Sequence, residues 1–163
     1  MKLKFNTEKV MSIFEGGFEE PTERFPDKIF TEVTKDFSTA TEGLAELGLI
    51  ELSGVERLVT SGLLNKRFRY KAILRSAYLP EYSFEVFEFG YDISLFPVSI
   101  DIEDGIRQEL GIEEGIDNNL VECSTETLFE QSLEEIFATK KFKRTVGGLM
   151  KIARVKQGSA ADF

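Results

Sequence analysis

The chain has 163 residues, of which 42% are hydrophobic and 30% are charged, a balance typical of one folded globular domain. It contains no histidine and a single cysteine, Cys123. These counts exclude Ser-His-Asp and Cys-His catalysis, histidine metal ligands and zinc sites built from several thiolates. One cysteine also excludes an internal disulfide, which favours the reducing cytoplasm.

No apolar run approaches the ~20 residues that a membrane helix needs. The first fourteen residues also lack the uninterrupted apolar region and the small-residue cleavage site of a signal peptide. We therefore expect a cytoplasmic protein that does not enter a membrane.

The net charge of −9 is distributed in blocks. Residues 1–75 hold twelve acids and twelve bases, residues 76–139 hold sixteen acids and one base, and residues 140–163 hold seven bases and one acid. Two interpretations fit the acidic block. Its acids are scattered and partly neutralised by the basic tail, or they form a docking face for a basic partner.

The N-terminal third predicts one short strand and two helices. Residues 1–5 alternate as an edge strand does, and a brief helix is expected from residue 7 to the glycines at 16 and 17. Helical spacing of apolar residues then extends from Pro26 to Leu47 and ends at Gly48. A break near residues 38–41 is an alternative, with Thr39 and Glu42 capping a second short helix.

The period changes to two between residues 47 and 100. Strands are expected at 49–52, 55–60 and 68–78, although 53–60 also fits a helix start, and the third of these carries a mostly basic exposed face. The segment 82–91 is either covered on both faces or bulged near Val86 and Phe87. With a bulge, Glu85 and Glu88 would meet the basic strand as cross-strand pairs. Residues 93–100 predict a further strand in which Pro97 indicates an edge or a bulge.

The acidic segment follows the predicted strands. We expect a helix from Asp101 to Gly111, an acidic loop at 111–119, a short strand at 120–123 and a helix capped by Ser124 with an apolar stripe over 128–137. Residues 140–156 fit a helix or a strand. The sequence therefore predicts a single α+β domain over 1–157, in which an antiparallel meander of four to five strands within 47–100 packs against N-terminal and C-terminal helices. Residues 158–163 are expected to form a flexible tail.

No sequence motif predicts a catalytic residue, a metal site or a cofactor. Asp101, Glu103 and Asp104 precede Gly105, but the calcium-loop spacing would place Ile100 where an acid is required. No phosphate-binding glycine motif occurs. Cys123 is expected to be a small buried hydrophobe. The basic run at 140–144 fits either phosphate binding or neutralisation of the acidic body, and the net acidity favours the second.

Three hypotheses for function remain. The preferred one is a non-catalytic acidic protein that occludes the active site of a basic partner, as an immunity or antitoxin protein does with a nuclease-like bacterial toxin, without binding nucleic acid itself. One alternative is a nucleic-acid mimic, for example a phage-encoded anti-defence protein, that blocks a DNA- or RNA-binding machine. The other is an enzyme that uses carboxylates with Mg²⁺ or Ca²⁺. The oligomeric state is not predicted. The partner-binding residues are expected to be the acids of the 101–117 segment, with those of the later helix as second choice: Glu103, Asp104, Glu109, Glu113, Glu114 and Asp117, then Glu130, Glu134 and Glu135.

Overall fold

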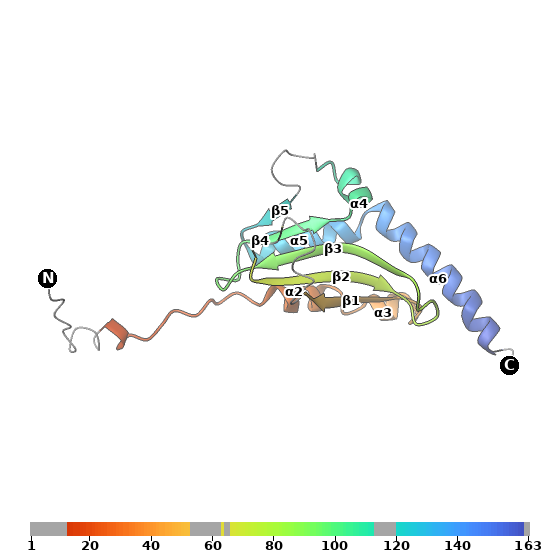
Figure 1. Cartoon of the computed structure of the whole chain (residues 1–163), viewed down its shortest axis with the longest axis horizontal. Helices are drawn as coiled ribbons and strands as arrows, with labels where there is room; N and C mark the ends of the chain where they lie inside the picture. Colours follow the sequence, from red (N-terminus) through yellow and green to blue (C-terminus); the bar gives the residue numbers. More distant parts are fainter. Residues whose placement is uncertain (1–12, 53–62, 64–65, 113–119, 162–163) are drawn as a thin grey trace.

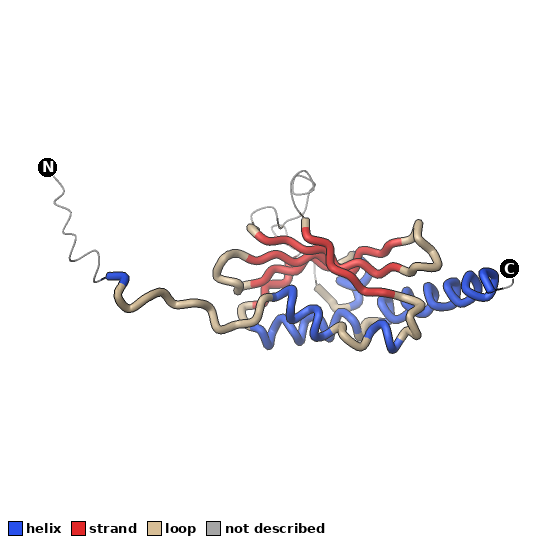
Figure 2. The backbone as a smooth tube through the Cα atoms, turned by 90° about the horizontal axis from the view of Figure 1, so that it is seen from below, coloured by secondary structure: helices blue, strands red, loops and turns tan. Residues whose placement is uncertain are grey.

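The fold is a five-stranded antiparallel sheet with helices against one face (Figures 1 and 2). The computed structural model describes residues 13–52, 63, 66–112 and 120–161. Each strand pairs with its neighbours in sequence, so the sheet order is β1-β2-β3-β4-β5. The strands are β1 (Glu46–Glu51), β2 (Phe68–Arg75), β3 (Ser83–Tyr91), β4 (Val98–Ile102) and β5 (Leu120–Cys123). The predicted α+β meander is confirmed, with the fifth strand at 120–123 rather than within 47–100.

The helices complete the second layer. They are α2 (Pro26–Val33), α3 (Phe37–Ala40), α4 (Asp104–Glu109), α5 (Glu126–Phe137) and α6 (Lys140–Ala161). Figure 2 shows helices on one side of the sheet. Edge-to-face aromatic contacts join the layers, since Phe30 of α2 packs 5.9 Å from Phe87 and Phe129 of α5 packs 5.4 Å from Phe89, measured between ring centroids. The core therefore lies between these helices and the alternate side chains of β3.

A β-bulge at Val86 sets the register between β2 and β3. Ala72 pairs with Phe87 and Ile73 pairs with Glu85, so Val86 has no counterpart on β2. The bulge was one of the two alternatives predicted for this strand, and it is confirmed. It places Glu85 and Glu88 on the same face of the sheet, opposite the helices.

The prediction of one long helix from Pro26 to Leu47 is wrong. The helix α2 ends at Val33. Next to this end, the Thr34 hydroxyl donates to the Phe30 carbonyl oxygen at 2.8 Å, a side-chain bond that competes with the backbone hydrogen bonds of a longer helix. A second short helix does form, but it begins after Asp36 rather than at the predicted Thr39 cap. Positive φ angles at Glu42 and Gly43 then turn the chain into β1, so Leu47 and Gly48 are strand residues.

Two predicted boundaries near the acidic segment also change. The strand expected at 93–100 begins at Val98, directly after Pro97, and it is interior because β4 pairs with both β3 and β5. Asp101 belongs to this strand and does not cap α4, whose N-cap is Glu103. The helix α5 is capped by Thr125 rather than Ser124, through a 3.2 Å bond from the Leu128 N–H.

The C-terminal segment is the helix α6, which continues through Gly147 and Gly148 and includes residues 158–161 of the predicted tail. Its buried face carries Phe142, Leu149 and Ala153. Among the described residues, its one ion pair joins Arg154 to Glu42 at 3.5 Å, between exposed side chains. Such pairs contribute little to stability. Glu42 lies outside the acidic block 76–139, so this pair does not neutralise that block, and the neutralisation by this segment stays a prediction.

Residues 13–25 extend from the body toward the N-terminus (Figure 1). Arg24, at the end of this segment, contacts Glu32 of α2 and both Glu126 and Glu130 of α5. No helix in the described part of the chain is long and apolar enough to cross a membrane. The strands predicted at 1–5 and 55–60 and most of the helix predicted from residue 7 lie outside the described residues.

Candidate functional site

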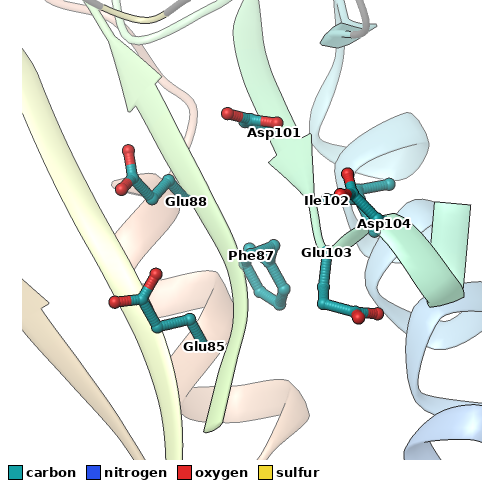
Figure 3. Close-up of a pocket in the computed structure, with 7 residues that line it drawn as sticks. All are labelled: Glu85, Phe87, Glu88, Asp101, Ile102, Glu103 and Asp104. Atoms are coloured by element: carbon teal, nitrogen blue, oxygen red, sulfur yellow. The ribbon is translucent and has the colours of Figure 1, made fainter. Parts of the chain in front are cut away.

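A hollow of about 270 Å³ lies on the sheet face opposite α2 and α5. Because side chains alternate along a strand, Glu88 on β3 faces away from the helices when Phe87 and Phe89 face them. Asp101 on β4 is the direct cross-strand partner of Glu88, so the two carboxylates share that face. The lining consists of five acids and two apolar residues: Glu85, Glu88, Asp101, Glu103, Asp104, Phe87 and Ile102 (Figure 3).

Local structure explains how the five acids converge. The bulge at Val86 brings Glu85 onto the same face as Glu88. At the far side of the hollow, β4 leads directly into α4, so Glu103 and Asp104 sit at the start of that helix (Figure 3). The Glu103 side chain accepts the Ile106 N–H at 2.8 Å, and an acid in the first turn interacts favourably with the helix dipole.

Three bases hold most of these acids in place. Lys71 Nζ lies 2.9 Å from Glu85 Oε1 and 3.8 Å from Glu88 Oε1. Glu88 is also 3.4 Å from the guanidinium of Arg69, which is 1% exposed. The cross-strand pairing of Glu85 and Glu88 with the basic strand is therefore confirmed.

The third base completes the charge balance of the hollow. Arg107, only 5% exposed, pairs with Asp104 at 2.9 Å. Among the described residues, five carboxylates thus face three bases at this hollow.

Asp101 differs from the other four acids. Its side chain makes no hydrogen bond or ion pair with the residues that the structure describes. Its pKa is raised, first by burial and then by the charge of Glu88, with Asp104 adding to the shift and Arg107 opposing it. The carboxylate is thus a hydrogen-bond acceptor with no described partner in a region of negative potential. Chemically, this arrangement favours a cationic group entering the hollow.

The structure distributes the predicted site residues over several places. Glu103 and Asp104 line the hollow. Glu109 instead caps α6, because its carboxylate accepts the N–H groups of Lys140 and Lys141 at 2.6 and 3.1 Å. Glu130 contacts Arg24, and Glu134 and Glu135 are exposed on α5. Glu113, Glu114 and Asp117 lie outside the described residues, so their assignment stays a prediction.

Three of the five lining acids were missing from the predicted site. Glu85 and Glu88 were assigned only to internal ion pairs, and Asp101 was assigned to a helix cap. The alternation of β3 with its bulge was readable from sequence. The pairing of Glu88 with Asp101 was not, because it depends on where β4 ends.

The hollow does not have the form of a metal site. In the parts of the chain that the structure describes, no three acid or cysteine side chains converge as metal ligands do. The enzyme alternative thus has an acid-lined concavity but no converging ligand set among those residues.

Cys123 is buried as predicted, its Sγ is 3.4 Å from Ser132 Oγ, and burial raises the pKa of its thiol.

Comparison with known proteins adds no relative from which a role could be transferred. No protein-family model, curated protein sequence or solved structure matches this chain significantly. The function must therefore be argued from the geometry of the site.

Proposed function

We propose that this protein is a non-catalytic binding protein whose acidic hollow docks on a basic partner and blocks that partner's active site. The partner class that fits best is a nuclease-like bacterial toxin, which would make this chain an immunity or antitoxin protein of the cytoplasm. A nuclease active site is basic because it must hold phosphates, so an acidic inhibitor complements it. The buried free thiol of Cys123 is in keeping with a reducing compartment.

The observation that carries the proposal is the set of five carboxylates around one hollow, with Asp101 lacking a described partner. Lys71 and Arg107 pair with Glu85 and Asp104, whereas the Asp101 carboxylate has no partner among the described residues. An arginine or lysine of the partner could therefore donate to Asp101 without displacing a described ion pair. A hydrogen bond to a charged group contributes about 1.5–3 kcal/mol.

The nucleic-acid-mimic alternative requires acids along an extended ridge. Five acids line the hollow here, a form that suits a single cationic side chain, and Glu46 of β1 and Glu122 of β5 lie on the same sheet face outside it. The concavity supports docking on a protein with one protruding base, and we retain the toxin inhibitor as the proposal.

The test is a rescue experiment with the genes that flank this one in its native genome. Each neighbouring reading frame is expressed alone and together with this chain in a sensitive bacterial host, and growth is measured. One neighbour should be toxic alone and tolerated with this chain. If no neighbour is both toxic and rescued, the immunity proposal is wrong.

A binding experiment then locates the interface with the partner so identified. Affinity is measured between 50 and 500 mM salt for the double variant Asp101→Asn/Glu85→Gln and for the control Glu19→Gln/Glu20→Gln, which removes two exposed acids of the N-terminal segment. The hollow variant should bind about 10- to 100-fold more weakly, with a smaller salt dependence. Equal losses in the two variants would place the interface elsewhere.

A further inference from the structure

A second and larger hollow, of about 460 Å³, lies on the helix-covered face at one end of the sheet. It forms where β1 ends, β2 begins and β3 ends, beside the first turn of α2. Its volume falls within the ~300–1,000 Å³ range typical of small-molecule sites. The acidic hollow faces the opposite side of the same strands, so the two sites are separate.

Four of the eight residues that line this hollow are aromatic. Phe68 and Tyr70 belong to β2 and Tyr91 to β3, and Phe25 directly precedes α2. The rings of Tyr70 and Tyr91 are nearly parallel, at 11° with centroids 6.2 Å apart, and Phe68 lies 5.3 Å from Tyr91. Phe25 and Phe68 remain 50% and 37% exposed, although aromatic rings of this size are normally buried. These rings are thus available for contact with a ligand.

Two carboxylates accompany the rings. Asp27 Oδ1 accepts the Tyr91 hydroxyl at 3.0 Å, and Glu51 lies exposed at the end of β1. The described lining of the hollow contains no basic residue. Burial raises the pKa of Tyr70 and Tyr91, and the charge of Asp27 raises it further at both. Two carboxylates and no base among the described lining residues thus make the lining acidic, with Lys28 beside it at Phe25.

The rim already carries one contact between a cation and a ring. The ammonium of Lys28 lies 5.9 Å from the centroid of Phe25. Ring faces attract cations through their quadrupole, and the attraction strengthens when the cation is desolvated. Leu95, in the turn between β3 and β4, also lines the hollow and has a positive φ of 72°.

We propose that this hollow binds an organic cation, namely an ammonium group whose nitrogen carries alkyl substituents. Such a group cannot satisfy many hydrogen bonds, so it selects π faces with a nearby carboxylate over a purely polar site. An uncharged apolar ligand would make no use of the Glu51 carboxylate, and a bare metal ion would gain nothing from the aromatic rings. The chemistry fits a free quaternary ammonium compound and an alkylated lysine side chain equally, and the experiment separates them.

The proposal is tested by ligand-observed NMR on the full chain, with choline as the probe. Its uncharged carbon isostere, 3,3-dimethylbutan-1-ol, controls for shape and apolar area. Saturation transfer to the N-methyl protons and their upfield ring-current shift report contact with the rings. Choline should bind at least fivefold more tightly than the isostere. Equal affinities, or no choline signal at tens of millimolar, would overturn the proposal.

Matched variants on one strand locate the binding. Glu51→Gln removes the carboxylate at this hollow, and Glu46→Gln removes an exposed carboxylate from the other face of β1. We expect Glu51→Gln to weaken choline about fivefold and leave the isostere unchanged, while Glu46→Gln changes neither. If the two variants behave alike, the choline site is elsewhere. Failure of this test leaves the acidic hollow unaffected, because the growth assay does not involve these residues.

The source of the ammonium group is settled by a second pair of ligands. A short peptide with one trimethyllysine is compared with choline and with the same peptide carrying unmodified lysine. Binding of the trimethylated peptide more tightly than choline assigns the ligand to a modified side chain. Binding of choline more tightly assigns it to a small molecule. Equal binding of the two peptides would overturn the preference for an alkylated nitrogen.

Discussion

Replacing Asp101 by Asn should stabilise the fold at neutral pH while it weakens partner binding. Asn keeps the shape of the side chain and removes the charge that burial and Glu88 disfavour. Because Glu88 and Asp101 are direct cross-strand partners, their repulsion costs about 0.2–1 kcal/mol. Arg107 offsets part of that cost. We therefore expect the free energy of unfolding to rise by about 0.5 kcal/mol, or about 1–2 °C in Tm for a chain of this size.

The pH dependence of this gain has a definite sign. The pKa of Asp101 is higher in the folded protein than in the unfolded chain, so the ionised form destabilises the fold at neutral pH. As pH falls through the folded pKa, Asp101 takes up a proton and that cost disappears. Below the unfolded pKa of about 3.9, Asp and Asn should be equivalent. The advantage of Asp101→Asn is thus present at pH 7.5 and lost by about pH 4.

Urea unfolding of the wild type and Asp101→Asn at both pH values is the assay. Glu81→Gln, which removes an exposed acid near the β2–β3 turn, controls for the change in net charge and should shift stability at most slightly. A variant less stable than the wild type at pH 7.5 would refute the electrostatic argument. So would a gain of the same size at both pH values, or one matched by Glu81→Gln.

Three further predictions concern the scaffold. Glu109→Ala removes the acceptor of the first two N–H groups of α6 and should lower the free energy of unfolding in urea by about 1 kcal/mol. The control Glu134→Ala on α5 should change it very little. Equal effects of the two variants would contradict the capping role of Glu109. Gly90→Ala would place Cβ 2.8 Å from Cβ of Lys66 and should destabilise by about 1–3 kcal/mol. Gly147→Ala has no atom within 4 Å of its new Cβ and should stabilise α6 by up to about 1 kcal/mol, and loss of stability there would show an unrecognised contact.

The central hairpin was predictable because its signals are local. Alternation over β2 and the spacing of Glu85 and Glu88 require one extra residue between them, which the bulge at Val86 supplies. The helix expected to reach Leu47 failed for a non-local reason. Leu47 fits a helical stripe, yet it pairs with Leu74 in the sheet, and that pairing is invisible in the segment itself.

The candidate site was predictable in part for a related reason. Charge density alone pointed to Glu103 and Asp104. A predicted cap two residues too early turned Asp101 from a strand residue that opposes Glu88 into a helix cap. Nothing local identified the aromatic hollow, the second hollow lined by Phe25, Phe68, Tyr70 and Tyr91. Its rings come from separate segments, and each ring alone is typical of a core.

The two hollows use the two faces of the same strands, and salt should distinguish them. Tyr70 and Lys71 are consecutive on β2, so one lines the aromatic hollow while the other pairs with acids of the acidic hollow. Attraction of a base to the acidic hollow is Coulombic, and at 1 M salt the screening length falls to about 3 Å. Choline should stay within about twofold of its low-salt affinity, because ring contact and desolvation hold it as well as charge. A basic partner should weaken at least tenfold over the same range. Equal salt dependence at both sites would mean that Asp27 and Glu51 alone hold choline, and the rings would then have no part in selecting it.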